Sequence, residues 1–246
     1  MLPFLLLSAC ATIDISNLDT ALPLSPRKFR VSPYYAIAPD LDTLVNEEEY
    51  ENEIGPLDMS DIELWIVAGL KADLACAKSL DLQARATVAH LSYCYQVGFK
   101  KYFGQWANLH FALSPYVSWG EGDFEGLDDD LEPRVRSDRI RSAGLKFLLT
   151  RKFELASITL APAANYSVLS EEKIATDAND EEYFYELCTP VLHGGAILTG
   201  SVSFNSLINI PVGLNLIPEI GLHVIKPQNR KTTVLPVFAL AMGLEF

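Results

Sequence analysis

The chain has 246 residues, 49% of them apolar, and carries 32 Asp and Glu against 19 Lys and Arg, a formal net charge of -13. This length and apolar content indicate one ordered domain and exclude a disordered chain. The acidic balance excludes a nucleic-acid binder, because a phosphate backbone requires a surface rich in Lys and Arg. The mean hydropathy is +0.15, yet after residue 10 no apolar run approaches the roughly 18 to 20 residues of a transmembrane helix. The apolar residues must therefore follow another pattern.

The amino terminus is a short apolar run that ends in two small residues and a cysteine. Its last four positions resemble the lipobox of bacterial lipoproteins: Leu7, Ser8, Ala9 and Cys10. The resemblance implies that residues 1–9 are a cleaved signal peptide and that Cys10 is acylated, and Ala11 after it favours sorting to the outer membrane. We expect residues 10–26 to be a lipid-anchored tether on the periplasmic side. The alternative is an ordinary buried strand with a core cysteine.

The other cysteines, Cys76, Cys94 and Cys188, have neither Cys-x-x-Cys spacing nor clustered His. We therefore expect no zinc site and no redox dithiol, and we interpret all three as packing residues.

From residue 27 onward apolar residues recur at every second position, which predicts strands. In one stretch Leu109, Phe111 and Leu113 alternate with His110 and Ala112. We predict about ten strands, with eight or twelve as alternatives, near 27–38, 60–73, 80–90, 93–103, 108–119, 139–149, 153–168, 186–203, 208–225 and 232–246.

The connections between these strands alternate in length. All three long ones, 39–59, 120–138 and 169–185, fall at odd positions, so they lie at one end of an up-and-down barrel. Taking the last only to residue 183, these stretches contain 22 acidic residues against three Lys or Arg, a net of -19 that leaves +6 for the remaining chain. The acidic charge is therefore predicted to gather at one rim.

The last strand indicates which face of the barrel meets water. One of its faces consists of Leu235, Val237, Ala239, Ala241, Gly243 and Glu245. A single charge is poor cover for a solvated outer surface, as a soluble barrel would need, but small residues suit a narrow lumen. The opposite face is apolar and therefore suits contact with lipid. A closed barrel can cross the membrane because every backbone hydrogen bond is satisfied within it.

That apolar face carries a second resemblance, to the final strand of bacterial outer-membrane β-barrel proteins. The matching positions are Phe238, Leu240, Met242, Leu244 and Phe246. The resemblance implies a closed antiparallel transmembrane β-barrel over residues 27–246, with this pattern read by the barrel-assembly machinery. The alternative is a terminal strand of a soluble sheet.

Strand parity also gives the polar residues that would point into the lumen: Glu63, Lys71, Asp73, Arg85, Lys100, His110, His193, Glu219, His223 and Glu245. One hypothesis is a salt-bridge network that plugs the lumen. The other is an outer-membrane hydrolase, in which His193 or His223 activates a Ser or water and Glu219 orients it.

One long connection has the spacing of a calcium loop, with oxygen donors Glu121, Asp123, Glu125 and Glu132 and a glycine at Gly126. The alternative is a solvated acidic loop. Loop aromatics are candidate partner contacts: Tyr50, Phe124, Tyr183 and Phe184.

The leading functional hypothesis is a porin-like barrel lipoprotein of the cell envelope with a structural or surface-interaction role, exerted through long acidic extracellular loops and without catalysis. A narrow solute or ion channel and a hydrolase are the alternatives. Expected partners are outer-membrane lipid and lipopolysaccharide, the barrel-assembly machinery and an unidentified extracellular partner. No cofactor is expected beyond the lipid on Cys10 and calcium at the acidic loop.

Overall fold

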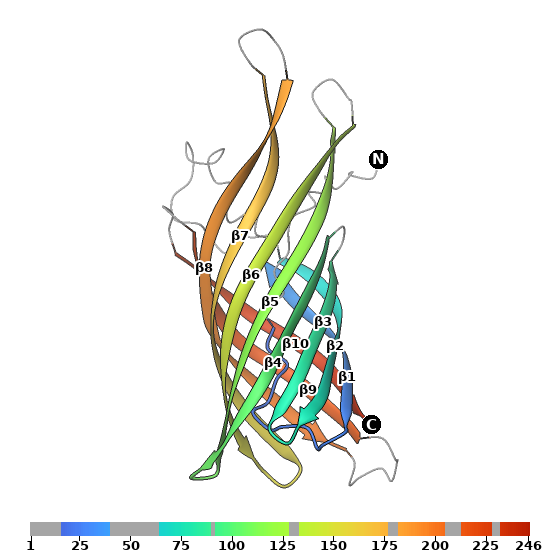
Figure 1. Ribbon diagram of the computed structural model, residues 1–246, viewed down its shortest axis with the longest axis vertical. Helices are drawn as coiled ribbons and strands as arrows, with labels where there is room; N and C mark the ends of the chain where they lie inside the picture. Colours follow the sequence, from blue (N-terminus) through green and yellow to red (C-terminus); the bar gives the residue numbers. More distant parts are fainter. Residues whose placement is uncertain are drawn as a thin grey trace, which may run out of the picture.

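The computed structural model describes residues 16–39, 64–89, 92–127, 133–176, 182–204, 213–227 and 232–246. They form ten strands: β1 (Phe29–Pro39), β2 (Leu64–Ala77), β3 (Leu80–Ala89), β4 (Ser92–Trp106), β5 (Leu109–Leu127), β6 (Pro133–Lys152), β7 (Ala156–Thr176), β8 (Glu182–Ser203), β9 (Gly213–Pro227) and β10 (Thr233–Glu245). Each strand pairs antiparallel with its chain neighbours, and β1 pairs with β10 to close the barrel (Figure 1). This confirms the predicted fold class and the strand count. No helix long and apolar enough to cross a membrane occurs among the described residues.

The two faces of each strand differ as the alternation predicted. In β10, Leu235 and Val237 are buried inside the barrel, whereas Phe238 and Leu240 are 43% and 49% exposed on its outside. The 13 residues of β10, at about 3.3 Å each and a tilt near 45°, span about 30 Å, which covers the roughly 25 Å apolar band of a membrane barrel. The apolar face is therefore outside and the polar face inside.

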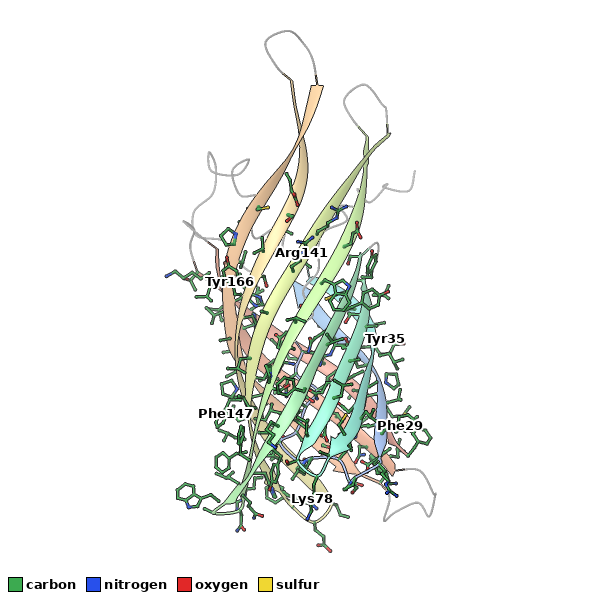
Figure 2. The ribbon with its side chains drawn as sticks, viewed as in Figure 1. Phe29, Tyr35, Lys78, Arg141, Phe147 and Tyr166 are labelled. Atoms are coloured by element: carbon green, nitrogen blue, oxygen red, sulfur yellow. The ribbon has the colours of Figure 1, made fainter. Side chains whose placement is uncertain are left out.

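Aromatic side chains form two groups on the outer surface. One group lies toward the long hairpins: Tyr35, Tyr93, Tyr95, Trp119 and Tyr166. The other lies toward the short turns: Phe29, Phe103, Trp106, Phe153 and Phe246. Figure 2 shows Tyr35 and Tyr166 nearer one end of the barrel and Phe29 and Phe147 nearer the other. Aromatic girdles at both edges of an apolar band are typical of transmembrane barrels.

Phe246, which follows β10, extends the seam between β1 and β10 by one residue pair. The amide of Phe29 donates to the carbonyl of Phe246 at 3.3 Å, and the amide of Phe246 donates to the carbonyl of Phe29 at 3.0 Å. The two rings stack with centroids 4.9 Å apart. Phe246 thus adds a pair of backbone hydrogen bonds and a ring contact at the end of this ladder.

Four strands are longer than predicted. The sequence placed strand ends at residues 119, 139, 168 and 186, but β5 to β8 continue to the pairs Leu127↔Pro133 and Thr176↔Glu182. Apolar alternation stops because no lipid contacts these segments, whereas backbone pairing needs no apolar side chains. The 22 residues of β8 reach about 50 Å at the same tilt, about 20 Å more than the span of β10. Figure 1 shows that the hairpins β5–β6 and β7–β8 project beyond the other strands.

The segment before β1 does not form an external linker. Residues 16–24, which the sequence assigned to a tether spanning 10–26, lie inside the barrel and are largely buried. We call residues 16–24 the inner segment. It satisfies polar groups that line the lumen, which residue spacing along the chain could not reveal. Cys10 and residues 1–9, which the sequence predicts to be a signal segment, lie outside the described residues.

Candidate functional site in the barrel lumen

Arg85 of β3 holds the first residues of the inner segment. Its guanidinium donates to the Ser16 carbonyl at 2.8 Å, to the Ser16 hydroxyl at 3.0 Å and to the Asn17 carbonyl at 2.9 Å. The guanidinium carbon also lies 5.3 Å from the ring centroid of Tyr34. Two backbone carbonyls buried in the lumen are thereby paired with a charged donor, which is a strong form of hydrogen bond.

The carboxylate of Glu219 on β9 binds the same part of the inner segment, by accepting hydrogen bonds from the backbone amides of that part. Its carboxylate accepts hydrogen bonds from the Asn17 amide at 2.9 Å, from the Leu18 amide and from the Thr199 hydroxyl at 2.6 Å. Arg85 and Glu219 therefore take the carbonyls and the amides of one short stretch. The stretch is fixed by its backbone as well as by its side chains.

Asp19 is the one acidic side chain that the inner segment brings into the lumen. Lys71 donates to Asp19 and to Asp73 at 2.7 Å each, and Gln83 donates to the same carboxylates at 2.7 and 2.9 Å. Buried charges are costly unless they are paired. Lys71 has one acidic partner in the barrel wall, Asp73, and the inner segment supplies a second, Asp19.

The far end of the inner segment is bound near the short turns. The Leu24 amide donates to Asp81 at 3.2 Å, and Lys100 donates to the Leu22 carbonyl at 2.9 Å while pairing with Asp81 at 3.0 Å. The Ala21 amide donates to the Thr150 hydroxyl at 2.7 Å. Both ends of the segment are thus attached to the wall.

The described lumen is electrically balanced. Its buried charged side chains are four basic and four acidic: Lys71, Arg85, Lys100 and Lys146 against Asp19, Asp73, Asp81 and Glu219. This supports the predicted network of compensating charges. The alternation of inward and outward positions along β3 could have predicted Asp81 and Gln83 as lumen residues too, because they share a face with Arg85. No such alternation could have predicted Asp19, because its segment is not a strand of the barrel.

The two histidines named in the hydrolase hypothesis do lie together. The Nδ1 of His193 and Nε2 of His223 are 2.7 Å apart, and the Nε2 of His193 is 2.7 Å from the Ser167 hydroxyl. Asn165 lies 3.4 Å from His193 and also accepts the Tyr116 hydroxyl. The buried cluster joins β7, β8 and β9.

Glu219 does not take the orienting role that the hydrolase hypothesis gave it. Its carboxylate is occupied by Asn17, Leu18 and Thr199. It precedes His223 on the same face of β9 by four residues, which is about 13 Å along a strand. The sequence identified the His pair but missed Ser167, which shares parity with Asn165 on β7.

The remaining sequence-predicted lumen residues lie apart from the inner segment. His110 is near the short-turn rim, where its Nδ1 is 3.0 Å from the Tyr102 hydroxyl. Glu245 pairs with Arg30 at 3.1 Å. Glu63 lies outside the described residues.

The calcium-loop spacing falls largely on an extended strand. Residues 121–127 belong to β5, and Glu121 accepts the Tyr93 hydroxyl at 2.7 Å and lies 3.4 Å from Arg139. A calcium loop of this spacing must fold back around the ion, which a straight strand does not do. Glu132 lies outside the described residues, and within those that are described no group of three or more His, Cys, Asp or Glu could hold a metal ion.

The cysteines differ from the packing role expected of them. Cys76 and Cys188 are exposed on the outer face, and Cys94 is half-buried. Among the described residues, none of the three forms a disulfide.

A closed antiparallel barrel with an apolar outer band, aromatic girdles and a polar, charge-balanced lumen defines the class of transmembrane β-barrels. Similar solved structures include the β domain of the Bordetella autotransporter BrkA, at 9% identity and a TM-score of 0.48, covering 89% of this chain and 98% of that one. The outer membrane protease OmpT from Escherichia coli is 8% identical with a TM-score of 0.45, covering 92% and 99%. The N-terminal barrel domain of Pseudomonas aeruginosa OprF is 6% identical with a TM-score of 0.31, covering 91% and 100%.

A scan against models of protein families gives no match, and a comparison with curated protein sequences gives none either. The likeness to the three solved barrels is one of general strand arrangement and assigns no activity.

Proposed function

We propose that this chain is a plugged, non-conducting barrel of the bacterial outer membrane, with a structural or surface-interaction role exerted through its projecting hairpins. The observation that carries the proposal is the inner segment, whose backbone and side chains pair with Arg85, Glu219 and Lys71 inside the lumen. A diffusion pore needs a continuous water path, and a chain bound across the middle of a ten-strand lumen opposes one.

The hairpins supply the surface. The stretches 120–138 and 169–183 contain 14 acidic residues against three Lys or Arg. Seven of the 14 belong to the parts of β5 to β8 that rise beyond the apolar band, and the other seven lie outside the described residues. A pair of projecting acidic hairpins suits a cationic partner, or divalent cations that bridge to the phosphates of lipopolysaccharide.

Single-channel recording in planar bilayers separates this proposal from a narrow channel. The wild-type protein should show no steady conductance, and an Asp19→Asn variant should show brief openings, because the inner segment loses its ion pair with Lys71. A control variant, Glu186→Gln, changes an exposed hairpin carboxylate and should stay silent. Steady conductance of the wild type would refute the plugged barrel and support the channel.

Protease treatment of intact cells tests which side the hairpins face. We propose that they face outside, so clipping within 120–138 is expected without permeabilisation. Clipping only after permeabilisation would refute this orientation.

We also propose that the outer face of β10 is the signal for the barrel-assembly machinery. This proposal is supported by four large apolar side chains that are exposed on that face: Phe238, Leu240, Met242 and Phe246. In cells, Phe246→Ala should lower the fraction of protein whose gel migration changes on boiling, whereas Phe153→Ala, which removes an equally exposed ring from a turn, should not. Equal assembly of the two variants would contradict the proposal.

A further inference from the structure

The outward face of β6 has an arginine at each edge of the apolar band. Arg141 and Arg151 are both exposed, and the outward positions between them are apolar: Ala143, Leu145, Phe147 and Leu149. The two arginines are ten positions apart. At about 3.3 Å per residue and a tilt near 45° this corresponds to about 23 Å across the membrane, close to the roughly 25 Å apolar band. Arg141 therefore lies at the hairpin-side edge, as Figure 2 shows, and Arg151 at the short-turn edge.

A second arginine lies just outside the hairpin-side edge. Arg139 is two residues from Arg141 on the same face of β6, about 7 Å along the strand and about 5 Å further from the membrane midplane. Its Nε lies 3.4 Å from the carboxylate of Glu121, which also accepts the Tyr93 hydroxyl at 2.7 Å. The Arg139 side chain is 57% exposed, so the N–H groups of its two Nη atoms can donate to a further acceptor.

Aromatic rings lie beside the two arginines. Trp119 is the cross-strand partner of Arg141, and Tyr95 is the partner of Trp119 on the next strand. The ring centroids of Tyr95 and Trp119 are 5.9 Å apart, and those of Tyr93 and Tyr95 are 5.5 Å apart. Trp and Tyr concentrate at the level of the lipid headgroups, because each has an apolar ring and a polar atom. Arg141 therefore lies at headgroup depth.

The surface between Arg141 and the middle of the band suits an acyl chain. Ala143 is the next outward residue, and its cross-strand partners are Val117 on β5 and Tyr166 on β7, which are 49% and 54% exposed. Leu145 follows at the next outward position and is also exposed. A lipid whose phosphate meets Arg141 can place an acyl chain against these side chains. A free phosphate ion would gain nothing from them, so this surface favours a lipid.

The two guanidinium groups also indicate the kind of phosphate. A guanidinium binds phosphate oxygens in a bidentate manner, and Arg139 and Arg141 offer two such groups side by side. A phosphate monoester presents three terminal oxygens and a charge of about -1.5 to -2, whereas a diester presents two oxygens and a single charge. Glu121 offsets one of the two positive charges, so binding depends on directed hydrogen bonds more than on net charge. Two neighbouring guanidinium groups suit a monoester better than a diester.

We propose that Arg139 and Arg141 bind the phosphate monoester of a lipid headgroup in the leaflet at the hairpin end, with Trp119 and Tyr166 beside its acyl chains. Because the hairpins are proposed to face outside, this lipid is the lipid A part of lipopolysaccharide. The choice of lipid A thus rests on the proposed function, whereas the phosphate site itself does not. The contact is direct and differs from bridging by divalent cations at the hairpins.

Native mass spectrometry of the purified barrel in detergent tests the site, with diphosphorylated lipid A as the probe. Arg141→Gln should weaken lipid A binding by about tenfold, and the double variant Arg139→Gln with Arg141→Gln should weaken it by about a hundredfold. All three substituted positions, including the control below, are exposed, and folding of each variant is verified by heat-dependent gel migration. Wild-type affinity in the double variant would overturn the proposal.

Arg151→Gln is the matched control. Arg151 lies on the same strand and the same outward face, and its guanidinium carbon is 5.6 Å from the ring centroid of Phe153. It has no second arginine two residues away, because those positions are Leu149 and Phe153. Its replacement should change lipid A affinity by less than about twofold. A loss equal to that of Arg141→Gln would mean that any exposed arginine serves, and would overturn a defined site.

The probes distinguish the possible sources of the phosphate. Lipid A whose phosphates have been removed by a phosphatase, and phosphatidylglycerol, a diester, should each bind at least about tenfold more weakly than intact lipid A. Millimolar inorganic phosphate should not displace lipid A, because it makes no contact with the apolar residues. Equally tight binding of phosphatidylglycerol would overturn the monoester assignment, and displacement by inorganic phosphate would overturn the assignment to a lipid.

This experiment can fail independently of the proposed function. Binding by purified protein in micelles depends neither on which side the hairpins face nor on whether the lumen conducts. If the double variant binds lipid A like the wild type while the wild type stays silent in bilayers, the lipid site is refuted and the plugged barrel stands. Steady wild-type conductance would refute the plugged barrel and leave the lipid site in place.

Discussion

Replacing Glu219 by Gln changes one oxygen of the carboxylate that binds the inner segment into an NH2 group. In the wild-type protein the two carboxylate oxygens of Glu219 accept hydrogen bonds from three donors: the amides of Asn17 and Leu18 and the hydroxyl of Thr199. In the Gln variant one donor must face another donor inside the lumen. No water is expected to compensate, because Glu219 is 6% exposed.

The size of the effect follows from these contacts. Hydrogen bonds to a charged acceptor contribute about 1.5–3 kcal/mol each, and an unsatisfied buried donor costs about 1–3 kcal/mol. Loss of the buried charge offsets part of this, since its desolvation no longer opposes folding. We therefore expect Glu219→Gln to lower the free energy of unfolding by about 2–4 kcal/mol.

Glu245→Gln is the matched control. Glu245 pairs with Arg30 at 3.1 Å, but the two side chains keep 24% and 16% of their exposure, so water screens the pair. Its replacement should cost less than about 1 kcal/mol. The two substitutions are chemically identical and differ in burial and in contact with the inner segment.

Urea titration of protein folded in detergent micelles measures both variants, with the fraction folded read from heat-dependent gel migration and tryptophan fluorescence. The midpoint of Glu219→Gln should fall well below that of the wild type while the midpoint of Glu245→Gln stays close to it. Equal midpoints for the two variants, or no change in either, would refute the view that the inner segment is an integral part of the folded barrel.

Three further outcomes are expected. A methyl group at Gly69 would overlap the buried Tyr34 ring, so Gly69→Ala should lower the free energy of unfolding by about 1–3 kcal/mol in the same titration. Gly200→Ala, whose methyl group would meet Pro218 at 3.3 Å, should lower it less. Equal urea midpoints for the two variants would contradict this packing. Ser167 is fully buried, so a fluorophosphonate probe should leave it unlabelled, and labelling abolished in Ser167→Ala would revive the hydrolase hypothesis. Calorimetry should detect no calcium binding attributable to residues 121–132, and heat at micromolar calcium that disappears in Glu125→Gln would contradict the strand geometry.

The barrel itself was predictable because its signal is local. Apolar residues recur with a period of two in every strand that has lipid on one side and the lumen on the other. In β10, for example, Phe238 faces outward and its neighbour Val237 faces the lumen. The same signal fails above the membrane. The upper parts of β5 to β8 contact no lipid, so the sequence there reads as acidic loop although the backbone ladder continues to Leu127↔Pro133.

The site was only half predictable. Parity places Arg85, Glu219 and His193 in the lumen, but parity does not say which of them meet. That depends on the register between strands, which sets His193 beside Ile225 on β9 and brings its ring to His223 rather than to Glu219.

The sequence by itself determined the alternation, a barrel of about ten strands, the apolar outer face and part of the set of inward charges, because each depends mainly on residues a few positions apart. Only the tertiary structure decided that Ser16 to Leu24 lie inside the barrel and that Asp19 balances Lys71. Asp19 and Lys71 are far apart in the chain and belong to an irregular segment and a strand. No repeating pattern joins them, and they meet because closure of the barrel encloses a lumen wide enough for one more chain.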